Sequence, residues 1–270
     1  MGLLQRLITA VFFVAIMLAG IYGGVHAFLG LFAIIGALSL WEFSGIVLKE
    51  SNDINRKIIS LIVGLLPFIL VSLFKLDIHI PTYIFAIFPA FLFLTFLFEL
   101  FRAADSPFKN ISFFLMGMIY ISLPFSLLAD IAISDGIYNS NLVFSLLILV
   151  WASDTGAYLV GSMIGKTPLF PRISPNKTWE GTIGGWVLSL LIGIALFYIF
   201  GILLLWQWLV LAVICAVFGT LGDLVESMLK RSFNIKDSGS LLPGHGGILD
   251  RFDAFLFVLP FVYAFLKLLN

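Results

Sequence analysis

Charged residues are scarce in this sequence. Lys, Arg, Asp and Glu make up 11% of the 270 residues, whereas 61% are hydrophobic and 16% are aromatic. A water-soluble domain has about 25% charged and about 45–50% apolar residues, so this composition excludes a soluble enzyme and indicates an integral membrane protein. Each membrane-spanning helix uses about 20 residues, so a chain of this length leaves no room for a separate soluble domain.

The sequence also lacks paired cysteines and an excess of either charge. Cys215 is the only cysteine, which excludes an internal disulfide and makes a small buried hydrophobe its simplest interpretation. Fifteen Lys and Arg residues balance fifteen Asp and Glu residues, so there is no basic field to attract nucleic acid. Heptads, low-complexity tracts and internal repeats are missing as well.

Long apolar runs dominate instead, and they predict about nine membrane-spanning helices. Their approximate bounds are 7–22, 25–48, 58–74, 83–101, 111–133, 142–160, 182–205, 206–229 and 248–269. The backbone of each run must be helical, because lipid offers no partners for free amide and carbonyl groups. The first run resembles a signal peptide, but a second span follows it after two glycines, so we interpret it as a retained helix. We therefore expect an all-α polytopic membrane protein.

The basic residues predict how the chain is oriented. All but two of the fifteen fall on alternate connections: Arg6; Lys49, Arg56 and Lys57; Arg102 and Lys109; Lys166, Arg172 and Lys177; Lys230, Arg231, Lys236 and Arg251. Lys75 and Lys267 fall on the other side. Because basic residues are retained in the cytoplasm, we expect a cytoplasmic N-terminus and cytoplasmic polar loops. We divide the chain into N-terminal membrane helices, residues 1–140, and a catalytic membrane region, residues 141–270, with cytoplasmic loops at 161–181 and 230–250.

Four of the carboxylates inside the apolar runs are expected at one depth: Glu42, Glu99, Asp154 and Asp223. All four are expected within roughly the last two or three turns before the cytoplasmic ends of their helices. A charge in hydrocarbon costs several kcal/mol, so each one suggests a function. The simpler interpretation of Glu42 and Glu99 is a carboxylate near the interface that is paired or hydrated. Asp154 and Asp223 lie deeper among polar residues, and for them we favour a functional role.

The eighth helix ends in a polar stripe. Its members stand at i, i+3, i+4 and i+7 on one helix face: Asp223, Glu226, Ser227 and Lys230. A short loop makes the ninth helix antiparallel to the eighth, so Asp250 and Asp253 at its start can meet these carboxylates. Hard oxygen ligands, with no cysteine and one histidine nearby, suit Mg²⁺ rather than zinc.

A glycine-rich turn precedes the ninth helix. Around His245, Gly246 and Gly247 the missing side chains let backbone amides approach an anion, and the helix N-terminus that follows favours phosphate. Four cations lie in the same segment: Lys230, Arg231, Lys236 and Arg251. These features predict a polyphosphate site. The alternative is a flexible cytoplasmic loop with an ordinary basic bias.

A second group of polar residues lies on the sixth predicted helix and in the loop that follows it. Gly161–Thr167 imitates a Walker A loop, but it is one residue short between its glycines and follows a membrane helix, so we reject that interpretation. Lys177 and Glu180 stand near the start of the seventh helix, which Ser174 or Thr178 can cap. A purely structural role and a binding role both remain open for this turn.

These segments resemble the signature of the phosphatidate cytidylyltransferases, the CDP-diacylglycerol synthases. The residues that carry the resemblance are Ser227, Lys230, Arg231, Lys236, Asp237 and the run 245–253, supported by 154–158 and 174–181. The resemblance implies transfer of a cytidylyl group from CTP to phosphatidic acid in the lipid bilayer, giving CDP-diacylglycerol and pyrophosphate. It also implies a requirement for Mg²⁺, room for a second cation, and a homodimer. The short N-terminus favours a bacterial inner membrane.

The resemblance assigns roles to the polar residues. The phosphate of phosphatidic acid is the expected nucleophile, so positioning and charge neutralisation carry the catalysis. We expect Asp223 and Asp250 to hold the metal, with Glu226 and Asp253 as further candidates. The candidate catalytic residues are Asp223, Asp250, Lys230, Arg231, Lys236, Asp237, His245 and Arg251. The candidate substrate-binding residues are Asp154, Lys166, Lys177, Ser227, Gly246 and Gly247.

Three other functions compete with this hypothesis. An ion-coupled transporter would use the intramembrane carboxylates, but it predicts charges near the midplane and broken helices in matching halves. A transferase that moves an alcohol onto a CDP-lipid would carry an Asp-Gly…Ala-Arg…Gly…Asp…Asp pattern, which the sequence lacks. A scaffold would not maintain so many costly charges.

The distribution of basic residues predicts which loops face the cytosol. In a Cys215→Ser background, cysteines placed at Asn52, Lys109 and Ser240 should react with an impermeant thiol reagent only from the cytosolic side. A cysteine at Asn139 should react only from outside. Labelling from the opposite side at any of these positions would contradict the nine-span topology.

Overall fold

The chain folds into two units. The computed structural model describes residues 3–48, 53–78, 81–102, 106–134, 136–239, 241 and 246–269, but not the side chains of 3–6 and 82–87. One unit comprises Met1–Tyr138 and Asp237–Asp250, and the other comprises Asn139–Lys236 and Arg251–Asn270. Residues 237–250, which the sequence analysis placed with the catalytic half, therefore group with the N-terminal helices.

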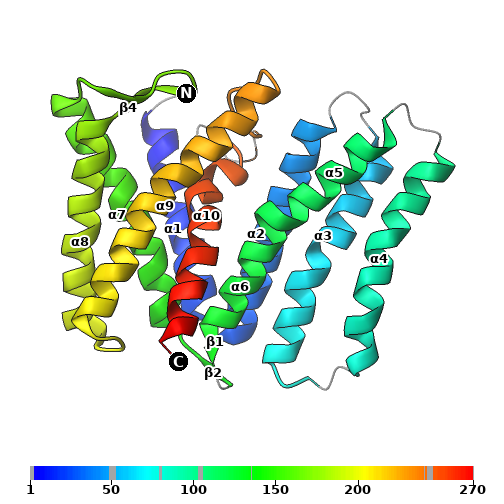
Figure 1. The fold of residues 1–270 in the computed structure, drawn as a ribbon. Helices are drawn as coiled ribbons and strands as arrows, with labels where there is room; N and C mark the ends of the chain where they lie inside the picture. The colour runs from blue at the N-terminus through cyan, green and yellow to red at the C-terminus, as the bar shows by residue number, and fades with distance from the viewer. Residues whose placement is uncertain are drawn as a thin grey trace. The chain divides into compact units, whose positions relative to one another are not determined.

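The first unit is built almost entirely from helices (Figure 1). They are α1 (Leu3–Tyr22), α2 (Val25–Val47), α3 (Ile54–Lys75), α4 (Thr82–Phe101), α5 (Pro107–Gly117) and α6 (Leu123–Ala132). A π-helical turn, Met118–Ser122, joins α5 to α6, so residues 107–132 form one continuous run. The Asp53 side chain accepts a hydrogen bond from the Asn55 amide at 3.0 Å and so caps α3.

The second unit contains four long helices. They are α7 (Ser140–Ile164), α8 (Trp179–Phe200), α9 (Leu205–Ser232) and α10 (Leu249–Leu268), whose first two residues belong to the first unit. Thr178 Oγ1 accepts a hydrogen bond from the Gly181 amide at 3.2 Å, which confirms Thr178 as the cap of α8. Gly201 ends α8 in the left-handed conformation, with a φ of 59°.

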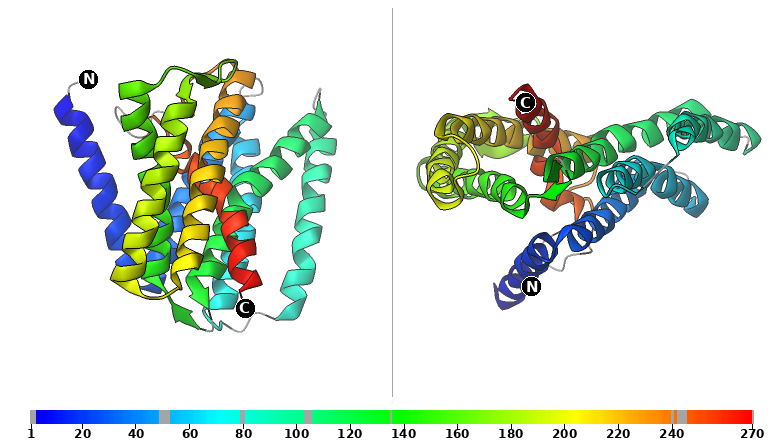
Figure 2. Two further views of the ribbon diagram at one scale, coloured as in Figure 1. Left: turned by 60° about the vertical axis from the view of Figure 1, so that its left-hand side comes forward. Right: turned by 90° about the horizontal axis from the view of Figure 1, so that it is seen from below.

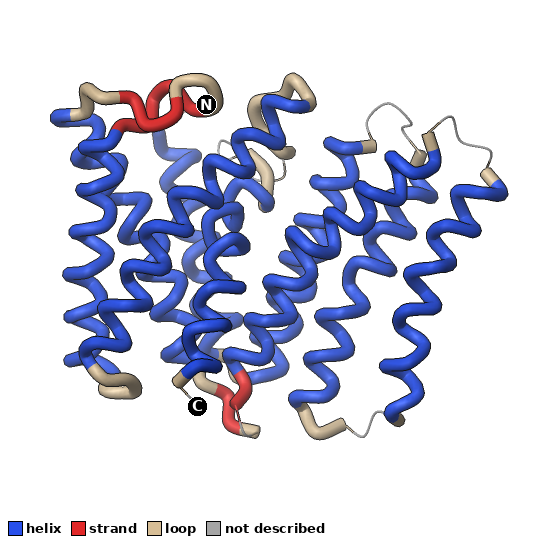
Figure 3. The backbone as a smooth tube through the Cα atoms, in the orientation of Figure 1, coloured by secondary structure: helices blue, strands red, loops and turns tan. Residues whose placement is uncertain are grey.

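Two short antiparallel strand pairs, shown in red in Figure 3, were not predicted. The first joins β1 (Ile133–Ser134) to β2 (Ile137–Tyr138), and the second joins β3 (Pro168–Phe170) to β4 (Ser174–Thr178). The Tyr138 hydroxyl donates to the Ile21 carbonyl at 2.7 Å, and burial raises the pKa of Tyr138 above its ordinary value. Both pairs only close connections between helices, so the predicted all-α fold is confirmed.

Six runs of described residues are long and apolar enough to cross a membrane. They are α2, α3, Pro107–Ala132, α7, α8 and α9. Two shorter apolar helices, Leu7–Tyr22 and Phe88–Phe101, accompany them, whereas α10 opens with three charged residues, Asp250, Arg251 and Asp253. The chain is therefore a polytopic membrane protein. The count of nine spans and the cytoplasmic N-terminus stay predictions.

An ion-pair network joins α3, α4 and α5 in the first unit. Arg56 Nε lies 2.7 Å from Glu99 Oε1, and Arg56 Nη2 lies 3.1 Å from Glu99 Oε2. Asn110 Nδ2 donates to the same Oε2 at 2.9 Å, and Arg102 pairs with Asp53 at 2.7 Å. Glu99 is only 1% exposed, so the interpretation of this residue as a paired carboxylate is confirmed.

Close helix contacts organise the second unit, where α8 packs against both α7 and α9 (Figures 1 and 2). The buried Ser189 hydroxyl lies within hydrogen-bond distance of the Leu149 and Ala212 carbonyls, at 3.3 and 3.2 Å. A Cβ added at Gly156 of α7 would lie 2.8 Å from the Gly184 carbonyl oxygen of α8. The backbones of α7 and α8 therefore meet where neither residue has a side chain.

Gly156→Ala should destabilise the protein, because the new methyl group meets backbone rather than a movable side chain. We expect a loss of about 1–3 kcal/mol, the usual cost of overpacking. Gly30→Ala on α2 is the matched control, because a Cβ there meets nothing within 4 Å. The control should be neutral or slightly stabilising, since alanine favours helices. Thermal unfolding in detergent measures both, and equal melting temperatures would contradict the close contact.

Candidate functional site

Three aspartates from three helices gather in the second unit. Asp154 of α7, Asp223 of α9 and Asp253 of α10 lie close enough to interact electrostatically. Asp154 and Asp223 lie in the C-terminal halves of α7 and α9, and Asp253 lies in the N-terminal half of α10. Like charges at this spacing repel one another, so the cluster requires cations nearby.

Cations from three elements surround these aspartates. Lys177 Nζ of β4 lies 2.6 Å from Asp223 Oδ2, which joins the 174–181 segment to α9. Arg251 interacts electrostatically with Asp154, and Lys230 with Asp253. The predicted site residues Asp154, Lys177, Asp223 and Arg251 therefore fall in one neighbourhood of the second unit.

The polar stripe of α9 also forms contacts along the helix itself. Glu226 is 0% exposed and forms an ion pair with Lys230, one turn later. The Ser227 hydroxyl donates to Asp223 Oδ1 at 3.3 Å. Glu226, a further metal candidate, is instead engaged in a buried pair, because a carboxylate in this position needs a compensating cation.

Glu180 closes the β3–β4 connection. Its carboxylate accepts hydrogen bonds from the Lys166 amide at 3.1 Å and from the Thr167 hydroxyl at 2.8 Å. These bonds give Glu180 a structural role at the start of α8. The Lys166 side chain is exposed beside it.

The backbone amides at the start of α10 bind carboxylates, whereas we expected them to bind phosphate. The Gly247 amide donates to Asp250 Oδ2 at 2.8 Å. The Ile248 and Leu249 amides donate to the two carboxylate oxygens of Glu42, at 3.0 and 2.9 Å. These amides bind carboxylates of the protein itself, because a helix N-terminus favours any nearby anion. The phosphate cradle at Gly246 and Gly247 stays a prediction.

The remaining predicted residues are Arg231, Lys236, Asp237, His245 and Gly246. Arg231, Lys236 and Asp237 are exposed, and Arg231 Nη1 donates weakly to the Ile235 carbonyl at 3.4 Å. Gly246 has a φ of 80°, a left-handed conformation that suits glycine. His245 lies outside the described residues.

A shared metal site of Asp223 and Asp250 stays a prediction, because the two residues belong to different units. Within the described ranges, no group of three or more His, Cys, Asp or Glu side chains is arranged as a set of metal ligands. The aspartate cluster of the second unit nevertheless supplies carboxylate oxygens and excess negative charge. Its chemistry fits a hard cation such as Mg²⁺.

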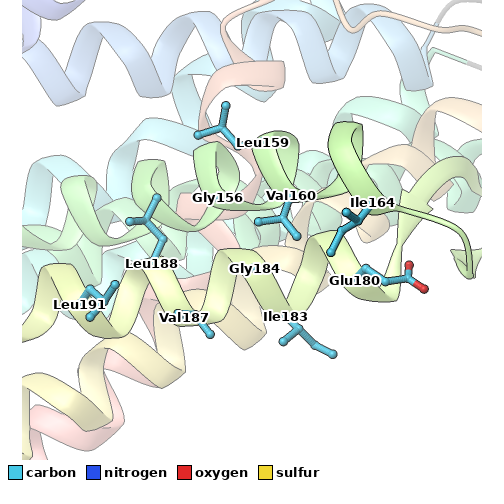
Figure 4. A pocket seen from close by; sticks show the side chains of 10 residues that line it. All are labelled: Gly156, Leu159, Val160, Ile164, Glu180, Ile183, Gly184, Val187, Leu188 and Leu191. Carbon is cyan, nitrogen blue, oxygen red and sulfur yellow. The ribbon is translucent and has the colours of Figure 1, made fainter.

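A groove of about 510 Å³ lies between α7 and α8 (Figure 4). Its walls are apolar side chains such as Leu159, Ile183 and Val187, and Glu180 lies at one end. None of the three clustered aspartates lines this groove. The groove therefore suits hydrocarbon, and the charged chemistry lies elsewhere.

Comparison with known proteins identifies the family. Residues 4–269 match the family model of the cytidylyltransferases. The chain belongs to this cytidylyltransferase family. Its membership supports the resemblance noted in the sequence and does not support the ion-coupled transporter.

Three bacterial proteins to which the chain is similar carry the name phosphatidate cytidylyltransferase. The Bacillus subtilis (strain 168) protein is 44% identical over 164 residues, 60% of this chain and 61% of that protein. The Staphylococcus haemolyticus protein is 49% identical and the Staphylococcus aureus (strain COL) protein 48% identical, each over 154 residues, 57% of this chain and 58% of the relative. The chain thus spans about three fifths of each relative. With the six apolar helices, these relatives confirm the prediction of a multi-pass bacterial membrane protein.

Two features escaped the sequence analysis. The pairing of Lys177 with Asp223 joins positions 46 residues apart that no helical spacing relates. The bonds from Ile248 and Leu249 to Glu42 span more than 200 residues. The sequence signal for the Glu42 contacts was the pair of glycines at 239 and 247. Glycines there indicate that another group approaches the backbone closely, but they do not identify that group.

Lys230→Met should destabilise the protein strongly, because it removes the cation that pairs with buried Glu226. Breaking a buried pair on one side costs about 3–5 kcal/mol, and the double variant Glu226→Gln/Lys230→Met should recover most of it. Lys236→Met, at an exposed lysine, is the control for the substitution itself. Thermal unfolding tests the pairing, and a Lys230→Met protein as stable as wild type contradicts it.

Proposed function

We propose that the chain transfers a cytidylyl group from CTP to phosphatidic acid, producing CDP-diacylglycerol and pyrophosphate. The observation that carries the proposal is the family match over residues 4–269. The names of the bacterial relatives support this pair of substrates. The charged cluster around Asp154 and Asp223, in a unit otherwise built from apolar helices, supports a site that receives a polar nucleotide beside lipid.

The chemistry requires little from the protein beyond positioning. An anionic oxygen of phosphatidic acid attacks the α-phosphorus of CTP and forms a new phosphoanhydride bond. The bond to the β-phosphate breaks, and pyrophosphate leaves with the electron pair. Because the nucleophile is already charged near neutral pH, neither a covalent intermediate nor a strong base is needed.

Side-chain cations have the main electrostatic task in this mechanism. Two phosphorylated substrates must approach each other against their mutual repulsion, so the site must neutralise negative charge. Lys177 and Arg251 lie in the neighbourhood of the aspartate cluster and can contact phosphate oxygens. Arg251 can do so with two parallel hydrogen bonds, which orient a phosphate as well as attract it.

The proposal includes Mg²⁺, held by Asp223 and Asp250 with Asp253 as a further ligand. When bound, the ion supplies charge neutralisation on the CTP phosphates. The three carboxylates of the second unit support a cation there, since their repulsion would otherwise raise the energy of the folded state. Asp154 belongs to the same cluster and can orient the set. A second cation and a homodimer are further parts of the proposal.

A reconstituted assay tests the reaction directly. Purified protein in detergent, given labelled CTP, Mg²⁺ and phosphatidic acid, should release pyrophosphate and produce a labelled lipid in equal amounts. Omitting phosphatidic acid should stop both products. Folded protein that yields no labelled lipid contradicts the proposed function.

Asp223→Asn and Asp250→Asn should each abolish turnover, because a neutral amide cannot replace a carboxylate on a hard divalent cation. If both carboxylates act on one ion, the double variant should lose no more activity than either single variant. Asp130→Asn is the control, because Asp130 pairs with Lys75 at 2.5 Å outside the proposed site. Mg²⁺ titration of folded protein measures the effect. Normal Mg²⁺-dependent activity in Asp223→Asn contradicts this metal assignment.

A further inference from the structure

We propose that Glu42 of α2 is a positioning residue for this reaction. Its carboxylate binds the segment between Ser238 and Asp250 and so holds Asp250 in its observed orientation. This inference rests on the proposed function, because Asp250 matters only if it serves the reaction. Sequence reasoning favoured a simple interfacial carboxylate at Glu42, and the contacts within the first unit give it a more specific role.

Glu42 is a buried carboxylate that binds a distant part of the chain. It is 6% exposed. Its Oε2 accepts hydrogen bonds from the Ser238 hydroxyl at 3.1 Å and from the Leu249 amide at 2.9 Å. Its Oε1 accepts a hydrogen bond from the Ile248 amide at 3.0 Å. One side chain therefore joins α2 to both ends of the 238–249 segment.

The Asp250 carboxylate also binds backbone amides of this segment. Its carboxylate accepts hydrogen bonds from the Gly247 amide at 2.8 Å and from the Ser238 amide at 3.0 Å. Ser238 therefore bridges the two carboxylates: its hydroxyl donates to Glu42, and its amide donates to Asp250. A shift of Ser238 or of the turn before α10 must also move the donors that orient Asp250.

Two glycines make room for the Glu42 carboxylate. A Cβ added at Gly239 would lie 2.5 Å from Glu42 Oε1, and one added at Gly247 would lie 2.4 Å from Oε2. Real Cβ atoms do not approach oxygen so closely, so a side chain at either position would displace Glu42. The room that the Glu42 carboxylate needs therefore explains why Gly239 and Gly247 carry no side chain, and this explanation requires no bound phosphate.

The hydrogen-bond partners of Glu42 explain how a charge is tolerated there. The described donors are the Ser238 hydroxyl and the amides of Ile248 and Leu249. The two amides lie at the N-terminus of α10, where the helix dipole favours an anion. Charge-assisted hydrogen bonds of this kind are stronger than neutral ones. A carboxylate is therefore the group best matched to these donors, whereas an amide is not.

Glu42→Gln tests the inference with almost no change in shape. The new NH₂ group must face the amide of either Ile248 or Leu249, so two donors oppose each other and one backbone bond is lost. Groups that orient metal ligands usually affect metal affinity or activity by about 10–100-fold, so we expect the Mg²⁺ concentration for half-maximal activity to rise by that factor. Hydrogen exchange of the Ile248 and Leu249 amides, measured without Mg²⁺ or CTP, should also become faster.

Glu99→Gln is the matched control. It makes the same substitution at a buried carboxylate of the same unit, but Glu99 binds Arg56 and Asn110 rather than the 238–250 segment. It should lower the melting temperature while leaving the Mg²⁺ dependence and the exchange of the Ile248 and Leu249 amides unchanged. Glu42→Asp keeps the charge and should restore part of the Mg²⁺ dependence lost in Glu42→Gln.

The outcomes separate this inference from the proposed function. If wild-type protein makes no CDP-lipid, the proposed function fails. If wild type is active and Glu42→Gln matches Glu99→Gln in both Mg²⁺ dependence and exchange, only the positioning role is overturned. If Glu42→Gln does not fold, Ser238→Ala replaces it, since that variant removes one bond to Glu42 and keeps the backbone bond to Asp250. Ser238→Ala should shift the Mg²⁺ dependence in the same direction by a smaller factor, and wild-type values there would overturn the inference.

Discussion

Compensation of buried charge is the constraint on which both units depend. An ionised group surrounded by apolar helices is tolerated only if opposite charges or hydrogen-bond donors surround it. Glu99 meets this requirement with Arg56, and Glu226 meets it with Lys230. Glu42 meets it with backbone amides at the start of α10. The Glu99 and Glu42 contacts also tie together separate chain segments that apolar packing alone would leave free to slide, because contacts between apolar side chains have little directionality.

The same constraint distinguishes structural carboxylates from those suited to chemistry. Glu99 and Glu226 are buried, and each has a cation in direct contact that compensates its charge. Asp154, Asp223 and Asp253 instead repel one another, and Lys177 contacts only Asp223 directly among the ion pairs described for this cluster. A metal ion or a phosphate-bound metal relieves repulsion of this kind when it binds between the carboxylates. Such a cluster is costly for folding and useful for binding.

Local patterns predicted the helices well and the site only in part. The apolar run at 142–160 lies within α7, Ser140–Ile164, because hydrophobic length directly reflects the membrane requirement. The cap at Thr178 was also predictable, since a cap and its amide are three residues apart. The strand pairs were not, because strands of two to five residues are too short to show alternation. The partners of Glu42 lie about 200 residues away, and no local spacing encodes them.

The glycine turn shows why sequence alone does not identify the anion that a helix N-terminus binds. Bare amides at a helix N-terminus do attract negative charge, and both Ile248 and Leu249 bind a carboxylate. Sequence alone does not distinguish a phosphate from a carboxylate elsewhere in the chain, because both satisfy the same donors. Since Glu42 and Asp250 occupy the amides of residues 247–249, these amides are not available to the triphosphate in this conformation. In the proposed reaction, side-chain cations such as Lys177 and Arg251 then provide most of the phosphate recognition. In the proposed role of Glu42, its hydrogen bonds help to orient Asp250, whose carboxylate is useful to a metal only if its orientation is maintained before the substrates arrive.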